Sequence, residues 1–89
     1  MIRENIKIIN KLGLHARAAA KFVNCSSRFA SHVQLIKEDR RVNGKSIMGV
    51  MMLAASQGSQ LTIEIAGEDE RSAYDALSAL VADRFGEAE

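Results

Sequence analysis

The chain has 89 residues, of which 47% are hydrophobic and 26% charged, a balance typical of one small globular domain with a single core. Twelve basic and eleven acidic residues leave a formal net charge of +1, so we expect no nucleic acid partner and no attraction to an anionic membrane. The single cysteine, Cys25, excludes an internal disulfide, and one cysteine with two distant histidines predicts neither a metal site nor a cofactor. The N-terminal residues form neither a signal peptide nor a membrane span, so residues 1–89 are predicted to form one cytoplasmic domain without membrane insertion.

Hydrophobic periodicity predicts a strand, a helix and a hairpin in the first half of the chain. Ile2, Ile6 and Ile8 alternate with polar residues, which predicts a strand over residues 3–9 with one buried face. An alanine-rich segment predicts a helix over residues 16–27. Its core side is expected to carry Ala19, Phe22, Val23 and Ser26, and its opposite side Arg17, Lys21, Asn24 and Arg28. That basic side is either a solvated helix face or a surface for an acidic partner. Residues 32–37 and 41–43 predict two strands joined by a polar turn.

The second half predicts a short helix, a strand and a final helix. Asn43 and Gly44 form a strong turn signal, and Ser46 is suited to cap a helix that follows. Residues 60–66 show the clearest strand alternation, and the acidic residues 68–70 favour the start of a last helix. That helix is expected to end at a glycine stop at Gly86 and to bury Ala73, Ala76, Leu77, Leu80 and either Val81 or Phe85. The order βαββαβα predicts an α+β open-faced sandwich, a four-stranded antiparallel sheet with three helices on one face.

The short helix after Ser46 is apolar on two sides. Ile47, Met48, Met51 and Met52 share one arc, and Val50, Leu53 and Ala54 share another. If Val50 and Leu53 face the core, the first arc is an exposed patch, and methionine-rich patches adapt to more than one partner. The alternative is a helix buried on all sides, and the pattern alone does not decide between the two.

The segment around His15 carries the chemistry. Gly13 permits a bend before the alanine-rich helix, so His15 lies at the helix start, where unpaired N–H groups and roughly half a positive charge favour an anion. Arg17 adds a planar set of donors suited to phosphate oxygens. The same positive surroundings disfavour the imidazolium, so His15 is expected to titrate below a free histidine and to act as a neutral nucleophile. The hypothesis is a histidine that becomes phosphorylated and whose phosphate is held by backbone N–H groups and Arg17.

Three other interpretations stay open at this point. A single histidine near a helix start is more often a surface residue or a side-chain cap than a functional group. A ferredoxin-like binding or RNA-contacting module has the same strand and helix count, although no aromatic pair lies on a strand to stack bases. A free-standing hydrolase would need an acid/base pair or a Ser-His constellation, and none is readable around His15.

Two segments together resemble one known family. The residues Gly13-Leu14-His15-Ala16-Arg17 followed by alanines, and Asn43-Gly44-Lys45-Ser46-Ile47-Met48-Gly49, closely resemble the bacterial histidine phosphocarrier HPr family, and the likeness spans the whole chain. The resemblance implies that Nδ1 of His15 accepts a phosphoryl group from phospho-enzyme I, which was charged by phosphoenolpyruvate. The group then passes to a histidine of a sugar-specific IIA protein or domain. The carrier is not a free-standing enzyme in this relay.

The resemblance also implies roles for other residues. Arg17 resembles the family's phosphate-assisting arginine, and Ser46 matches a position that a dedicated kinase phosphorylates in some members. The residues expected to contact partners are Ile47, Met48, Met51, Lys21, Asn24 and Lys45. Family members commonly have proline where this chain has Ala18, and alanine is expected to leave the helix start more mobile. A sugar-uptake carrier and a carrier of a nitrogen-related regulatory branch are not distinguished by sequence.

Overall fold

A computed structural model describes all 89 residues and confirms the predicted order of elements. The four strands are β1 (Ile2–Lys7), β2 (His32–Lys37), β3 (Arg40–Asn43) and β4 (Gln60–Ala66), and the three helices are α1 (Ala16–Ser26), α2 (Ile47–Met52) and α3 (Glu70–Ala82), followed by the short 3-10 turn Arg84–Gly86. None of these helices is long and apolar enough to cross a membrane.

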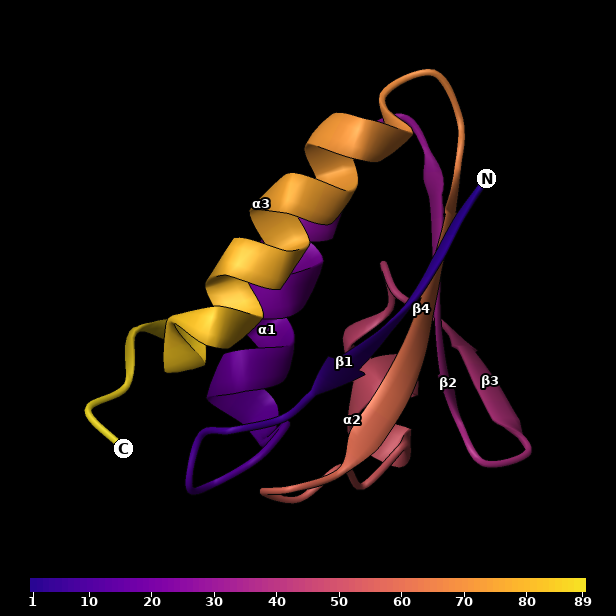
Figure 1. The fold of residues 1–89 in the computed structure, drawn as a ribbon. Coiled ribbons are helices and arrows are strands. Elements are labelled where there is room, and N and C mark those ends of the chain that lie inside the picture. The colour runs from indigo at the N-terminus through magenta and orange to yellow at the C-terminus, as the bar shows by residue number, and fades with distance from the viewer.

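The strands form one sheet in the order β1-β4-β2-β3, antiparallel at every pairing. Helices α1 and α3 lie side by side against one face of this sheet (Figure 1). β1 pairs with β4 along its whole length, from Ile2 opposite Ile65 to Lys7 opposite Gln60. β1 ends two residues before the predicted boundary, yet Ile8 stays attached to the loop before β4, because its N–H donates to the Ser59 carbonyl at 2.9 Å. The sheet therefore carries the chain directly to the loop before α1.

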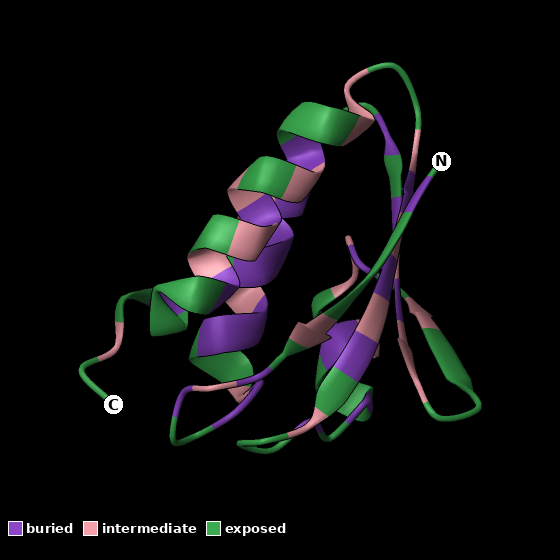
Figure 2. Ribbon diagram, in the orientation of Figure 1, coloured by how far each residue is buried: buried purple, intermediate pink, exposed green.

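A single apolar core fills the space between the sheet and the helices. Leu35, Ile63 and Ile65 project from the two central strands and are fully buried, as are Phe22 of α1 and Leu77 of α3. In Figure 2 the buried parts of α1 and α3 face the strands, whereas their outer sides are exposed. The prediction of a one-sided sandwich is confirmed.

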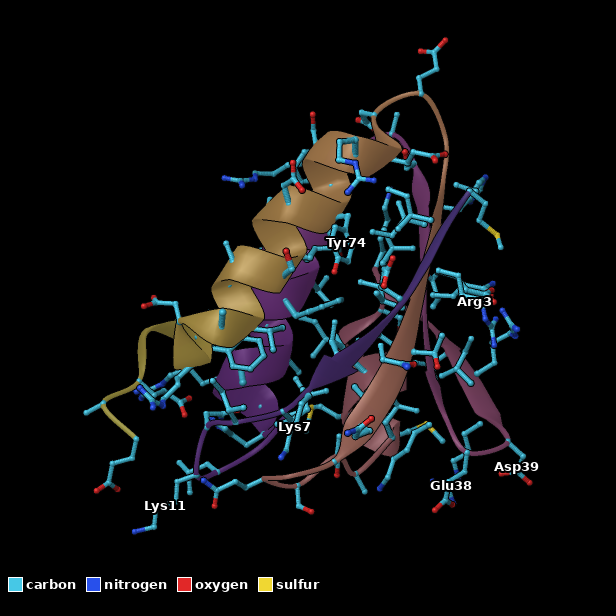
Figure 3. All side chains as sticks on the ribbon, in the orientation of Figure 1. Arg3, Lys7, Lys11, Glu38, Asp39 and Tyr74 are labelled. Atoms are coloured by element: carbon cyan, nitrogen blue, oxygen red, sulfur yellow. The ribbon has the colours of Figure 1, made fainter.

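The opposite face of the sheet is polar. Arg3 points from β1 away from α1 and α3 (Figure 3) and forms an ion pair with Glu64 of β4. Arg41 of β3 approaches the other oxygen of the same carboxylate at 2.6 Å. Glu64 thus joins three strands on the open side, and no helix covers them.

The end of α3 differs from the prediction. The helix ends at Ala82 rather than running to a stop at Gly86, and Arg84 and Phe85 both adopt left-handed backbone conformations, with φ of 56° and 54°. Such backbone costs about 1–3 kcal/mol at a non-glycine residue. The Phe85 side chain is fully buried, a gain of about 1.5–3 kcal/mol that offsets part of the strain at the two residues. This turn sends the C-terminal tail back toward α1.

The buried face of α3 also differs in part. Ala73, Leu77, Val81 and Phe85 are all buried, so both of the last two candidates reach the core. Ala76 and Leu80 are only half-buried, because they line a groove between α3 and α1 rather than facing the sheet.

Asp69 fastens the start of α3 to the loop after α1. Its carboxylate accepts the backbone N–H groups of Ala30 and Ser31 and the Ser31 hydroxyl, at 2.8, 2.9 and 2.5 Å. These hydrogen bonds, the Ser31 hydroxyl first, lower the pKa of Asp69. Both helices that cover the sheet are therefore held at the end opposite His15.

We expect Asp69→Asn to lower the midpoint of thermal unfolding near neutral pH. Because folding lowers the pKa of this carboxyl, its stabilisation is present above the ordinary value of about 3.9 and is lost as pH falls through the lowered value. The difference between wild type and variant, followed by circular dichroism, should shrink from about pH 7 to about pH 3. Asp75→Asn serves as the control, since Asp75 forms only an exposed pair with Arg71 at 3.9 Å. An equal effect of both variants at all pH values would contradict this role for Asp69.

Candidate functional site

The loop between β1 and α1 is pinned by close backbone packing at Gly13. A Cβ at this position would lie 2.4 Å from the carbonyl oxygen of Ala55, which leaves no space for a side chain. Gly13 also has φ of +68°, a backbone conformation that favours glycine. The next residue, Leu14, donates its N–H to the same Ala55 carbonyl at 2.8 Å. Buried Asn10 closes the loop from inside, because its Nδ2 donates to the Gly13 carbonyl at 2.8 Å. These contacts fix where α1 begins.

His15 occupies the N-cap position of α1, as predicted. Its backbone is extended, with φ of −74° and ψ of 179°, and its side chain makes no capping hydrogen bond. The Ala19 N–H donates to the His15 carbonyl, and the preceding amides of Ala16, Arg17 and Ala18 have no backbone acceptor. The helix therefore starts with free N–H groups beside a half-buried imidazole, an arrangement that favours an anion.

The imidazole of His15 contacts a carboxylate that sequence analysis did not single out. Its Nε2 lies 2.5 Å from Oε2 of Glu87, and Oε1 of Glu87 accepts a hydrogen bond from Nδ2 of Asn10 at 3.0 Å. Hydrogen bonds from Asn10 first, and then from His15, lower the pKa of Glu87. No hydrogen bond engages Nδ1 of His15. One ring nitrogen is thus occupied and the other is free.

Glu87 reaches His15 across 72 positions of sequence. The C-terminal tail lies beside the loop before α1 (Figure 1), and the Lys11 N–H donates to the Glu89 carbonyl at 2.7 Å. Lys11 is labelled in Figure 3, where it extends from this loop on the side of the tail. No local pattern around residue 87 signals the contact, because it depends on the turn after α3.

Arg17 shares an open pocket of about 730 Å³ with His15. The other residues that line it are Lys11, Leu12, Ala16, Glu87, Ala88 and Glu89. Arg17 is exposed and forms no hydrogen bond or ion pair, so its guanidinium is available to a ligand in the pocket. The structure brings the predicted nucleophile and the predicted anion-binding arginine into one site.

Ser46 and α2 lie as the sequence indicated, and the exposure of α2 is now decided. The hydroxyl of Ser46 accepts the Gly49 N–H at 3.1 Å and caps the helix. Val50 and Leu53 are buried, whereas Met48 is 70% exposed. The exposed residues of this side, here called the α2 patch, are Ile47, Met48, Met51 and Met52. The helix therefore keeps an apolar side outside the core.

The remaining predicted contact residues are spread over the molecule. Lys21 and Asn24 line a second pocket of about 640 Å³ between α1 and α3, which shares no lining residue with the His15 pocket. The Lys21 ammonium donates to the Phe85 carbonyl at 2.6 Å, and the Lys45 ammonium donates to the Phe29 carbonyl at 2.6 Å. No group of three or more His, Cys, Asp or Glu side chains is placed to hold a metal ion.

Comparisons with known proteins identify the family. The family model for the PTS HPr component phosphorylation site matches residues 2–83. The phosphocarrier protein HPr of Cupriavidus necator is 55% identical over 89 residues, and that of Neisseria meningitidis is 54% identical, each covering both chains completely. The crystal structure of HPr-C-His from Thermoanaerobacter tengcongensis is similar with a TM-score of 0.96 at 45% identity, covering all of both chains. The chain therefore belongs to the HPr family, the phosphocarrier proteins of the bacterial phosphotransferase system.

Proposed function

We propose that His15 accepts a phosphoryl group from phosphorylated enzyme I, which takes it from phosphoenolpyruvate, and delivers it to a histidine of a IIA protein or domain. Membership of the HPr family supports the carrier role. The assignment to His15 rests on its Nδ1, which makes no hydrogen bond and lies at a helix start without a side-chain cap. Arg17, which forms no hydrogen bond or ion pair, lines the same pocket. This relay would operate in the cytoplasm.

The transfer requires little beyond positioning and charge. The lone pair of Nδ1 forms the new bond to phosphorus, and the bond from phosphorus to the donor atom of enzyme I breaks with its electron pair retained by that atom. The phosphoryl group then carries about −2 charge at neutral pH, beside the unpaired amides of α1 and the Arg17 guanidinium. Delivery to a IIA histidine is the same exchange in reverse, with that histidine as the nucleophile.

The α2 patch is the surface on which we place both partners in turn. Its methionine side chains are flexible and polarisable, so they fit apolar surfaces of different shapes. Lys21, Asn24 and Lys45 lie outside the patch and would add polar contacts to a partner that covers more than α2. Each ammonium uses one of its three donors on a backbone carbonyl and keeps two for an acidic partner.

Ser46 provides a regulatory position within this surface. Its hydroxyl caps α2 immediately before Ile47, so a phosphate there would add about two negative charges next to the α2 patch. Desolvating that charge opposes docking of an apolar or acidic partner surface. A kinase acting on Ser46 would thereby reduce phosphoryl transfer without touching His15.

Whether the carrier serves sugar uptake or nitrogen-related regulation depends on which IIA protein accepts its phosphoryl group. Both kinds of IIA protein present a histidine to the phosphorylated His15, so the chemistry at His15 does not distinguish them. Offering the phosphorylated chain to purified acceptors of both kinds, and measuring which of them removes the label fastest, assigns the branch.

His15→Ala should abolish phosphorylation. Incubation with phosphoenolpyruvate and enzyme I should give the wild type an acid-labile, base-stable phosphate, because a phosphoramidate is hydrolysed when its nitrogen is protonated. His32→Ala is the matched control, since His32 is exposed on β2 and lies outside the pocket. Label on the His15→Ala variant, or its loss from the His32→Ala variant, would refute the assignment.

Arg17→Ala should slow transfer from enzyme I by roughly 10- to 100-fold, the effect of losing a charge-assisted hydrogen bond to phosphate. The measurement is the rapid-quench rate of His15 phosphorylation at saturating enzyme I. Arg28→Ala, an exposed arginine in the turn after the same helix and outside the His15 pocket, should keep the wild-type rate. Equal rates for both variants would remove Arg17 from the site.

Met48→Gln should weaken binding of enzyme I by roughly 5- to 30-fold, because it replaces an exposed thioether of the α2 patch with an amide that must be desolvated. Titration calorimetry measures the change, and the transfer rate should recover at saturating partner. Ser46→Asp should weaken binding of enzyme I in the same way. Ser72→Asp, at an exposed position of α3, should leave the affinity unchanged. Unchanged affinity in the Met48→Gln and Ser46→Asp variants would place the docking surface elsewhere.

A further inference from the structure

We propose that Glu87 is a positioning residue for His15: its carboxylate holds the proton on Nε2 and thereby keeps the lone pair on Nδ1. The inference rests on the proposed phosphoryl transfer at Nδ1. It concerns the C-terminal tail, which is not part of the two segments that identify the site.

The tail is fixed close to His15 by several independent contacts. Buried Phe85 anchors its start, and the Lys21 ammonium binds the Phe85 carbonyl. Two residues beyond Glu87, the Glu89 carbonyl accepts the Lys11 N–H at 2.7 Å. Glu87 is thus held on both sides, and its side chain is only 15% exposed. The contact with the imidazole is part of an ordered segment.

Asn10 sets the orientation of the Glu87 carboxylate. Asn10 is completely buried, and its Nδ2 donates both to the Gly13 carbonyl at 2.8 Å and to Oε1 of Glu87 at 3.0 Å. The other oxygen, Oε2, is left facing Nε2 of His15 at 2.5 Å. A residue of the loop that places His15 therefore also places its carboxylate partner.

The chemistry of the contact selects one tautomer. An ionised carboxylate accepts hydrogen bonds and cannot donate one, so the imidazole nitrogen facing it must carry the proton. In a neutral imidazole the other nitrogen then holds the lone pair. Hydrogen bonds from Asn10 and His15 lower the pKa of Glu87, which keeps this carboxylate ionised at neutral pH. Nδ1, the nitrogen without a partner, is consequently the nucleophilic one.

The same contact acts during transfer. When the Nδ1 lone pair forms the bond to phosphorus and the donor atom leaves with its electron pair, the ring gains positive charge while the proton stays on Nε2. The Glu87 carboxylate faces that proton and stabilises the charge. Arg17 acts on the phosphoryl oxygens and Glu87 on the ring, so their contributions are separable.

The test compares Glu87→Ala and Glu87→Gln with Asp83→Asn. Asp83 is an exposed carboxylate after α3 whose side chain makes no hydrogen bond and lies outside the His15 pocket, so its variant controls for the loss of one negative charge. Glu87→Gln keeps the length of the side chain but offers one oxygen to two donors, Nδ2 of Asn10 and Nε2 of His15. Because the two donors face different oxygens of the carboxylate, the glutamine amide would turn its NH2 group toward one of them, so the effect should appear even where the fold is unchanged.

The first readout is the tautomer of His15 in the unphosphorylated protein, from nitrogen-15 NMR of the imidazole. We expect the Nε2-protonated form in the wild type and in Asp83→Asn, and a mixture of tautomers in both Glu87 variants. The second readout is phosphorylation by enzyme I, where kcat should fall about 10- to 100-fold with little change in the KM of enzyme I for this chain, the size of effect known for carboxylates that orient metal-bound histidines. A purely structural role would not change the tautomer.

The outcomes separate this inference from the proposed function. Wild-type tautomer and rate in both Glu87 variants would overturn the role of Glu87 while leaving His15 as the carrier. An equal loss in Asp83→Asn would also overturn it, since the effect would then be one of net charge. If wild-type His15 takes no label, the proposed function fails, and the tautomer measurement alone decides whether Glu87 fixes the ring.

Discussion

The backbone contact between Gly13 and Ala55 joins the loop that holds His15 to the end of the helix that carries the α2 patch. Because no side chain fits at Gly13, the loop before α1 lies directly on the segment that follows α2. Further hydrogen bonds tie the same two segments together, from Leu14 to Ala55, from Gly58 to Ile8 and from Gln57 to Ile9. The start of α1 and the end of α2 therefore form one unit. His15 and the exposed apolar side of α2 are thereby held in fixed relation by backbone contacts.

A helix of only six residues, such as α2, needs support at both ends, because isolated short helices are unstable in water. Ser46 caps its N-terminus. At its C-terminus, Arg40 donates to the Met52 carbonyl at 2.8 Å, and the Lys37 ammonium lies within 3.3 Å of the Leu53 and Ala54 carbonyls. Basic side chains of the hairpin thus satisfy the carbonyls that the helix leaves unpaired. This support lets α2 keep its helical form although its apolar side is exposed.

The features that the sequence predicted are those set by residues close together in the chain. Alternation gave the strands, the alanine run gave α1, and the spacing of Gly13, His15 and Arg17 gave the centre of the site. The exposure of α2 was not decided, because both of its arcs are apolar and only the packing of Val50 and Leu53 into the core distinguishes them. Glu87 was missed for a different reason. Its contact requires left-handed backbone at Arg84 and Phe85, a conformation that neither residue type favours. Burial of the Phe85 ring and the hydrogen bond from Lys21 to the Phe85 carbonyl stabilise this conformation, and both are tertiary contacts.

Ala18 shows how one residue serves both the core and the site. Its side chain is completely buried against the apolar core, and its N–H is one of three at the helix start without a backbone acceptor. Proline at this position would fix the backbone of the first turn but has no N–H to offer. Alanine gives up that rigidity and keeps a third amide at the end of the helix that faces the His15 pocket. The contacts of Asn10 and Gly13 hold the residues immediately before the helix. The loop before α1 therefore fixes where the helix, and with it His15, begins.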